Sequence, residues 1–230
     1  RLGKLKLTGV KLLVLDEFDR LLGKQHLDEV RTVIRLLPTG RQALLLSATA
    51  GTAAVRMAEE LFAPRLIRVE STAASYENYY HIVPFRDKIK AVQKLTRRLP
   101  IRRGLVFVGR SFDAAHALEK LRFEGIKAVA LLGQERRDQR RAALDAIRAG
   151  RAELLISTDL AARGLDIEDV DYVIHLDLPE DVRTYRHRAG RTARAGKEGA
   201  VISLVDEKEM DKLKALAARM EIELSRLPRA

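Results

Sequence analysis

The 230-residue chain contains no cysteine and no tryptophan. Without cysteine it can form neither a disulfide bond nor a thiolate metal site. Aromatic residues make up only 5% of the chain, so a nucleic-acid surface built from bases stacked on aromatic rings is not expected. The sequence also has no apolar run long enough for a transmembrane helix and no secretory signal pattern. A cytoplasmic protein is therefore the default expectation.

Acidic residues are outnumbered by basic ones. The chain carries 43 Lys and Arg against 32 Asp and Glu, which gives a formal net charge of +11. Such an excess favours a polyanionic partner, most often nucleic acid, although a basic solvated surface is the plain alternative. Since aromatic residues are scarce, any binding of nucleic acid is expected to use its phosphate backbone.

A phosphate-binding loop of the form GxxxxGK[ST] is also missing. The segment nearest to this pattern begins at Gly190 and continues to Gly196 and Lys197. It has one residue too many between the glycines, and Glu198 stands where the loop needs a hydroxyl residue. We therefore reject it as a phosphate loop.

Short apolar runs alternate with helical patterns in two series along the chain. The first series predicts strands over 10–15, 43–46 and 66–69, and helices over 26–36 and 53–62. The small polar residues 70–75 are typical of a linker. The second series predicts strands over 79–83, 104–108, 127–131, 153–156, 172–176 and 200–204, and helices over 87–98, 114–123, 138–148 and 207–220.

This alternation favours a mostly parallel sheet covered by helices on both faces. The second series is long enough for a whole α/β domain, whereas the first supplies only a few strands. We therefore predict half a domain over 1–70, a linker over 71–78 and a complete domain over 79–225. The half-domain should expose the apolar faces of its strands and should associate or be locally disordered.

Polar clusters follow three of the predicted strands, at the end where parallel sheets bind their ligands. Asp16 and Glu17 follow the first strand, and Ser47-Ala48-Thr49 follows the second. Ser157-Thr158-Asp159 follows the strand over 153–156. Two acidic side chains after a buried strand commonly hold magnesium over a nucleotide phosphate. One polar loop alone would mean little, but three together favour a ligand site.

Three arginines recur at every third position: Arg188, Arg191 and Arg194. On a helix they would share one face. With no acidic residue between them, their guanidinium groups favour a bound anion such as a phosphate. The alternative is a solvated basic face.

Taken together, these motifs resemble those of DEAD-box RNA helicases of helicase superfamily two. Residues 14–19 (VLDEFD) resemble the acidic box, with Phe18 where alanine is usual, and residues 47–49 resemble the SAT motif. Residues 157–167 resemble the fifth motif, and residues 187–194 the HRxGRxxR motif. The resemblance implies a RecA-like parallel sheet sandwiched by helices. It would comprise one complete C-terminal domain and the second half of an N-terminal RecA-like domain.

The same resemblance implies ATP and Mg²⁺ as cofactors and RNA as the partner. Asp16 and Glu17 would serve the magnesium and the attacking water, while Arg191 and Arg194 would reach the γ-phosphate. Gly164 and Asp166 would bind the nucleotide. Coupling between domains would involve Asp19, Ser47, Thr49, His187 and Arg188. RNA would be contacted by Arg110, Gly133, Arg140, Thr158 and Arg163.

The activity implied by the resemblance is ATP hydrolysis coupled to local RNA unwinding. Because the phosphate loop is missing, we expect the 230 residues alone to be inactive and to be a fragment of a longer protein. A non-enzymatic RNA- or partner-binding module is one alternative, and a DNA translocase of the same superfamily is another. Two departures weaken the RNA prediction: Gly109-Arg110-Ser111 differs from the usual pattern, and Arg137 replaces a glutamine.

Overall fold

The computed structural model describes residues 6–47, 50–63, 65, 67, 76–133, 135–162, 167, 170–193 and 197–227. The chain divides into two compact units, Arg1–Glu70 and Ser71–Ala230.

The first unit is a small parallel sheet with helices. Strand β1 (Leu12–Asp16) pairs in parallel with β2 (Gln42–Leu46). Helices α1 (Phe18–Leu21), α2 (Leu27–Leu36) and α3 (Thr52–Phe62) complete it. The core contains Leu15, Phe18, Leu22, Val30 and Ala58. The four predicted elements between residues 10 and 62 are confirmed within two residues, whereas the linker over 70–75 and residues 66, 68 and 69 of the predicted strand lie outside the described residues.

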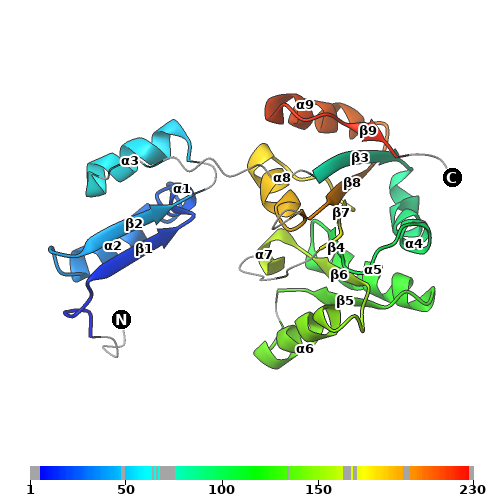
Figure 1. Cartoon of the computed structure of the whole chain (residues 1–230), viewed down its shortest axis with the longest axis horizontal. Helices are drawn as coiled ribbons and strands as arrows, with labels where there is room; N and C mark the ends of the chain where they lie inside the picture. Colours follow the sequence, from blue (N-terminus) through cyan, green and yellow to red (C-terminus); the bar gives the residue numbers. More distant parts are fainter. Residues whose placement is uncertain are drawn as a thin grey trace. The chain divides into compact units, whose positions relative to one another are not determined.

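The second unit contains a seven-stranded sheet in which every pair of neighbours is parallel (Figure 1). The strand order is β5-β6-β4-β7-β8-β3-β9. The bounds are β3 (Tyr76–Ile82), β4 (Gly104–Phe107), β5 (Ala128–Leu131), β6 (Leu154–Ser157), β7 (Tyr172–His175), β8 (Gly199–Val205) and β9 (Ser225–Arg226).

Helices cover both faces of this sheet (Figure 1). They are α4 (Lys88–Arg98, after the short 3₁₀ turn Phe85–Asp87), α5 (Ser111–Phe123), α6 (Arg137–Arg148), α7 (Asp159–Ala162), α8 (Val182–Ala189) and α9 (Met210–Met220). Successive strand residues point to opposite faces. In β4, Leu105 and Phe107 pack into the core that includes α6, α8 and α9. Val106 packs into the core that includes α4 and α5. The predicted fold class, a parallel sheet sandwiched by helices, is confirmed.

Strand β3 begins at Tyr76, three residues before the start that the sequence predicts. Its residue Asn78 is buried and accepts a hydrogen bond from the Tyr185 hydroxyl at 2.9 Å. The polar sequence over 76–78 therefore belongs to the sheet, and the predicted linker over 71–78 overlaps the strand there. Within the described ranges, none of the helices has the length and apolar character needed to cross a bilayer.

Candidate functional site

The acidic turn of the first unit lies where β1 ends. Asp16 pairs with Leu46, so Ser47 follows at the same edge of the sheet. Oδ1 of Asp16 accepts the Glu17 backbone N–H at 3.0 Å. Glu17 has φ 52° and ψ 45°, a left-handed conformation that costs roughly 1–3 kcal/mol in a non-glycine residue. Two adjacent carboxylates thus lie at the carboxyl edge of the sheet, where the sequence predicts them, and the structure adds that their turn is strained.

Phe18 supports this turn by packing into the core of the first unit. Its side chain is 6% exposed and packs in the core with Leu15, Leu22 and Val30. The ring anchors the start of α1, which carries the predicted coupling residue Asp19. A large side chain at this position is therefore part of the fold of this unit. The predicted residue Thr49 lies outside the described residues.

Three of the predicted RNA-contact residues gather at one edge of the second unit. Arg110, Gly133 and Thr158 each follow the carboxyl end of a strand, respectively β4, β5 and β6. These strands are neighbours in the order β5-β6-β4. Thr158 is 7% exposed, and its hydroxyl accepts the Ala161 N–H at 3.3 Å, which caps α7. Arg140 lies on α6, and Arg163 lies outside the described residues.

The turn at Gly133 already holds an anion from the chain itself. Gly133 has φ 88°, a conformation that favours glycine. Its N–H donates to Oε2 of Glu135 at 2.9 Å, and the Leu132 N–H donates to Oε1 of the same carboxylate. A phosphate that reaches this turn must therefore compete with Glu135, a residue that sequence reasoning missed.

Arg110 is also paired. Its Nε donates to Oδ2 of Asp113 at 2.9 Å, one helical turn further on. This hydrogen bond and the nearby charges of Asp113 and Asp177 raise the pKa of Arg110. The Arg110 side chain is 81% exposed, so it remains accessible to a phosphate while Asp113 orients it.

Arg188 and Arg191 of the HRxGRxxR segment do not lie on one helix face. Helix α8 ends at Ala189 with Gly190 as its C-cap, so Arg191 lies in the following turn. Arg194 lies outside the described residues, as do Gly164 and Asp166. Because the helix ends early, the expectation of a single basic face over these positions is wrong.

Arg188 is buried, with 3% of its surface exposed. Its Nε and Nη2 donate to the two carboxylate oxygens of Asp159 at 2.7 and 2.8 Å, and Nη1 donates to the Asp177 carbonyl at 2.6 Å. The guanidinium also lies 4.8 Å from the centre of the Phe107 ring. The anion that the sequence predicts for this arginine is Asp159 of the same chain.

Arg191 is held between two buried neighbours, Arg188 and Thr192. Its N–H donates to the Arg188 carbonyl at 3.1 Å, and the next N–H, of Thr192, donates to Ala189 at 3.0 Å. The Thr192 hydroxyl donates to the Val170 carbonyl. A side chain at Gly199 would meet this hydroxyl, so the close approach requires glycine. The backbone of the arginine turn is therefore fixed on both sides.

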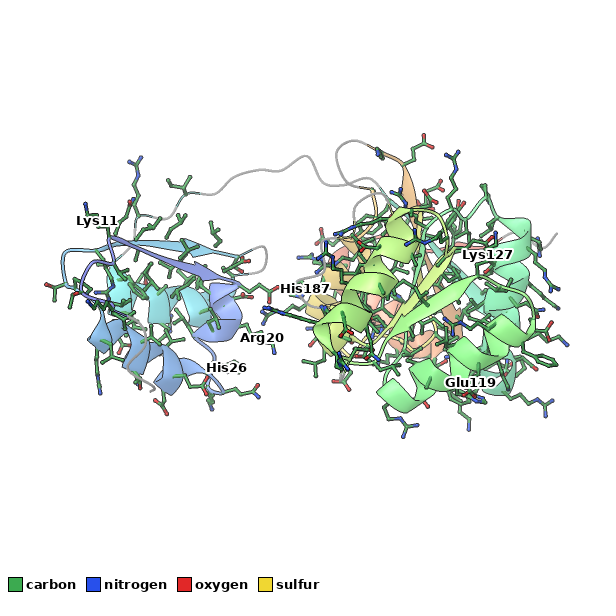
Figure 2. The ribbon with its side chains drawn as sticks, turned by 90° about the horizontal axis from the view of Figure 1, so that it is seen from below. Lys11, Arg20, His26, Glu119, Lys127 and His187 are labelled. Atoms are coloured by element: carbon green, nitrogen blue, oxygen red, sulfur yellow. The ribbon has the colours of Figure 1, made fainter. Side chains whose placement is uncertain are left out.

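Helix α8 rests on a buried polar pair in the sheet. Nδ1 of His175 lies 3.0 Å from the Ser203 hydroxyl, and the His175 and Tyr185 rings pack in a T-shaped arrangement with 4.9 Å between their centres. Burial, and then the positive charge of Arg188, lower the pKa of His175 well below its ordinary value, so the ring is neutral. The predicted coupling residue His187 lies on α8 and extends from the surface of this unit (Figure 2).

A parallel seven-stranded sheet covered by helices on both faces places the second unit in the RecA-like class. Residues 2–57 match the sequence profile of DEAD/DEAH box helicases, and residues 87–196 match that of the helicase conserved C-terminal domain. The chain belongs to the DEAD-box helicase family.

Its relatives include the DEAD-box ATP-dependent RNA helicase CshC of Bacillus cereus and the probable ATP-dependent RNA helicase YfmL of Bacillus subtilis. Each is 38% identical over 96% of this chain. The chain spans 58% of the first and 60% of the second.

Two solved structures are similar as well. S. cerevisiae Dbp5 bound to RNA and ADP BeF3 is 32% identical with a TM-score of 0.84, over 97% of this chain and 61% of that one. E. coli SrmB bound to RraA, the regulator of ribonuclease activity A, is 31% identical with a TM-score of 0.62, over 67% of this chain and 91% of that one.

Proposed function

We propose that the chain is part of an ATP-dependent RNA helicase, which couples RNA-stimulated ATP hydrolysis to local unwinding of an RNA duplex. One observation carries the proposal: the sheet edge that gathers Arg110, Gly133 and Thr158 is joined, through Asp159 and Arg188, to the fixed turn of Arg191. Residues suited to RNA phosphates and a residue suited to a nucleotide phosphate thus belong to one rigid unit. The names of the relatives support the same activity.

ATP with Mg²⁺ is the proposed cofactor. No group of three or more His, Cys, Asp or Glu side chains suited to a metal occurs among the described residues. Magnesium usually takes one or two carboxylates and completes its shell with water and phosphate oxygens. Asp16 would hold the ion, in part through water, and the bound magnesium would neutralise charge on the phosphates.

The remaining steps would fall to side chains of this chain. Glu17 would orient the attacking water and accept its proton. Arg191 and Arg194 would stabilise charge on the γ-phosphate, a role worth roughly three to five powers of ten in rate. Gly164 and Asp166 would bind the nucleotide. Two RecA-like domains, one including residues 1–70 and the other beginning with β3 at Tyr76, would close over ATP and RNA together.

RNA is the proposed partner, bound through its backbone by Arg110, Gly133, Arg140, Thr158 and Arg163. Contacts to phosphates carry no direct sequence information, so little base specificity is expected. Asp19, Ser47, Thr49, His187 and Arg188 would couple domain closure to the state of the nucleotide. A cytoplasmic location stays a prediction.

Phosphate release with saturating RNA tests the assignment of the nucleotide site. The 230 residues contain no phosphate loop, so we expect them alone to show no useful turnover, and robust RNA-stimulated turnover would contradict this. A longer chain that includes such a loop should hydrolyse ATP, and Glu17→Gln in that chain should abolish turnover while RNA binding persists. Full turnover by the Glu17→Gln variant would overturn the role given to Glu17.

A non-enzymatic RNA- or partner-binding module is the second candidate. The missing phosphate loop favours it, whereas the strained acidic turn at Asp16 and Glu17 has no use in a pure binding protein. RNA binding without ATP hydrolysis in the longer chain would establish this alternative. Unwinding of a DNA duplex in preference to an RNA duplex would instead establish a DNA translocase.

A further inference from the structure

The loop that follows β7 supports both the RNA-contact turn and the arginine helix. We propose that Asp177, in this loop, is a positioning residue for RNA binding: its side chain fixes the turn that carries Arg110, and its backbone fixes Arg188. The inference rests on the proposed function and adds a residue to which none of the motifs points.

The side chain of Asp177 reaches the turn after β4. Its Oδ2 accepts the Gly109 N–H at 2.7 Å. The loop itself stays bonded to the end of β4, because the Leu176 and Asp177 N–H groups donate to the Phe107 carbonyl at 3.0 and 3.2 Å. Gly109 directly precedes Arg110, so the carboxylate fixes the backbone from which the exposed guanidinium extends.

The backbone of the same residue reaches the arginine helix. The Asp177 carbonyl accepts from Nη1 of Arg188 at 2.6 Å, and the other nitrogens of that guanidinium bind Asp159. Asp159 is the neighbour of Thr158. One loop therefore joins the turn after β4, the turn after β6 and the end of α8.

A buried lysine, Lys88, holds this loop in place. The Leu176 carbonyl accepts from Nζ of Lys88 at 3.0 Å, and the same ammonium pairs with Glu209 at 2.6 Å. Lys88 is only 2% exposed, so the anchor is shielded from water. A rigid support of this kind is what a phosphate contact needs, because such contacts weaken when the binding groups are misplaced by as little as about 0.5 Å.

The two contacts can be separated by mutation, because one uses the side chain and the other the backbone. Asp177→Ala removes the acceptor for Gly109 but keeps the carbonyl that binds Arg188. Asp177→Asn removes the charge as well but keeps an oxygen that can accept the Gly109 N–H. The two variants have the same charge, and only Asp177→Asn keeps a side-chain acceptor for the Gly109 N–H.

Asp171 offers a matched control at the other end of β7. Its Oδ2 accepts the N–H groups of Arg102 and Arg103, both at 2.9 Å. The chemistry is the same as at Asp177, but the contact lies at the amino edge of the sheet, away from the predicted RNA residues. Asp171→Ala therefore reports what the loss of such a contact does to stability alone.

The test uses the full 230-residue chain and a fluorescently labelled single-stranded oligouridine. RNA affinity is measured by anisotropy, stability by thermal melting, and exchange of the Gly109 amide by hydrogen–deuterium exchange. We expect Asp177→Ala to bind RNA about three- to tenfold more weakly than Asp177→Asn and to exchange Gly109 faster. We expect Asp171→Ala to lose stability but to bind RNA within about twofold of the wild type.

Equal RNA affinities of Asp177→Ala and Asp177→Asn would overturn the inference. So would an Asp171→Ala variant that loses as much RNA affinity as Asp177→Ala, because the effect would then be general destabilisation. Failure of the wild-type chain to bind RNA at all would be a different result. It would overturn the proposed RNA-binding function, and the inference with it.

Discussion

At the scale of single residues, the predicted phosphate contacts are already engaged with carboxylates of the chain. Asp113 pairs with Arg110, Glu135 occupies the N–H groups at Gly133, and Asp159 pairs with Arg188. If RNA binds at the first two places as proposed, its phosphates would replace these carboxylates. The exposed pair at Arg110 should open easily, since such pairs contribute about 0–1 kcal/mol. Opening should be harder at Arg188, which is 3% exposed and also donates to the Asp177 carbonyl.

The exchange at Arg110 gives a direct prediction. Asp113→Asn removes the competing charge, so RNA affinity should rise about two- to fivefold, with little change in stability. Fluorescence anisotropy with labelled RNA measures this. Asp145→Asn is the control, because it makes the same change of charge beside the exposed Arg141 on α6. An equal rise in both variants would show a general charge effect and contradict competition at Arg110.

Asp181 gives a second prediction at this scale. It is the N-cap of α8, and its Oδ1 accepts the Thr184 N–H at 2.7 Å. Asp181→Ala should cost about 1 kcal/mol, or about 2–4 °C in the melting temperature of a unit of this size. Circular dichroism measures the loss, and a melting temperature unchanged by Asp181→Ala would exclude the capping role.

The same contact gives the stability a pH dependence. Partial burial raises the pKa of Asp181, but the hydrogen bonds from Thr184 and the charge of Arg183 outweigh burial, so the net shift is downward from 3.8. Stability from a lowered pKa is present above the unfolded value and is lost as the pH falls through the folded pKa. Melting curves from pH 7 to pH 3 should therefore show a smaller acid loss for Asp181→Asn, which keeps the cap without the charge.

At the scale of elements, the sequence predicted the long helices and the fully buried strands. Strand β4 is a continuous apolar run because all its residues are buried between two helical layers. The helices α1 and α7 have four residues each, too few for a helical period to be seen. Strand β9 has two exposed residues and carries no apolar signal. Its pairing with β3 depends on tertiary contacts that local sequence does not encode.

Substitutions at Phe18 test whether its side chain supports the acidic turn at Asp16 and Glu17. Phe18→Ala would restore the residue that is usual in the family, but it would leave a cavity in a small core and should cost about 3 kcal/mol or more. Phe18→Leu keeps most of the volume and should cost less. Hydrogen–deuterium exchange should show protection lost over 12–46 in Phe18→Ala, with unchanged exchange in β4 and β6. Unchanged protection of the first unit would contradict the anchoring role.

At the scale of the whole molecule, the motifs predicted the residues of the candidate site. They did not predict which groups of the chain itself bind those residues. Sequence spacing placed Arg188 with Arg191, yet the first is buried against Asp159 and the second lies in a turn beyond the helix. The supporting residues Glu135 and Asp177 lie outside every motif. They become visible only when parallel strands bring loops that are distant in sequence to one edge.

The two units also differ in how completely they are covered. In the second unit, helices lie on both faces of the sheet. In the first, alternate strand residues pack on the helices, whereas the opposite face leaves Leu12, Val14, Leu44 and Leu46 45–50% exposed. We call these four residues the open face. Parallel sheets are normally buried on both faces, and an apolar patch of this kind favours association.

The 230-residue chain should therefore associate through its open face. Sedimentation velocity should show species larger than the monomer at concentrations of tens of micromolar. The double variant Val14→Thr, Leu44→Thr should shift the chain toward monomer, because threonine keeps the strand propensity but adds a polar group. Phe123→Ser is the matched control, since Phe123 is 89% exposed on the second unit and lies outside the open face. If Phe123→Ser reduced association as strongly as the double variant, or if the wild-type chain stayed monomeric, the open face would not be the interface.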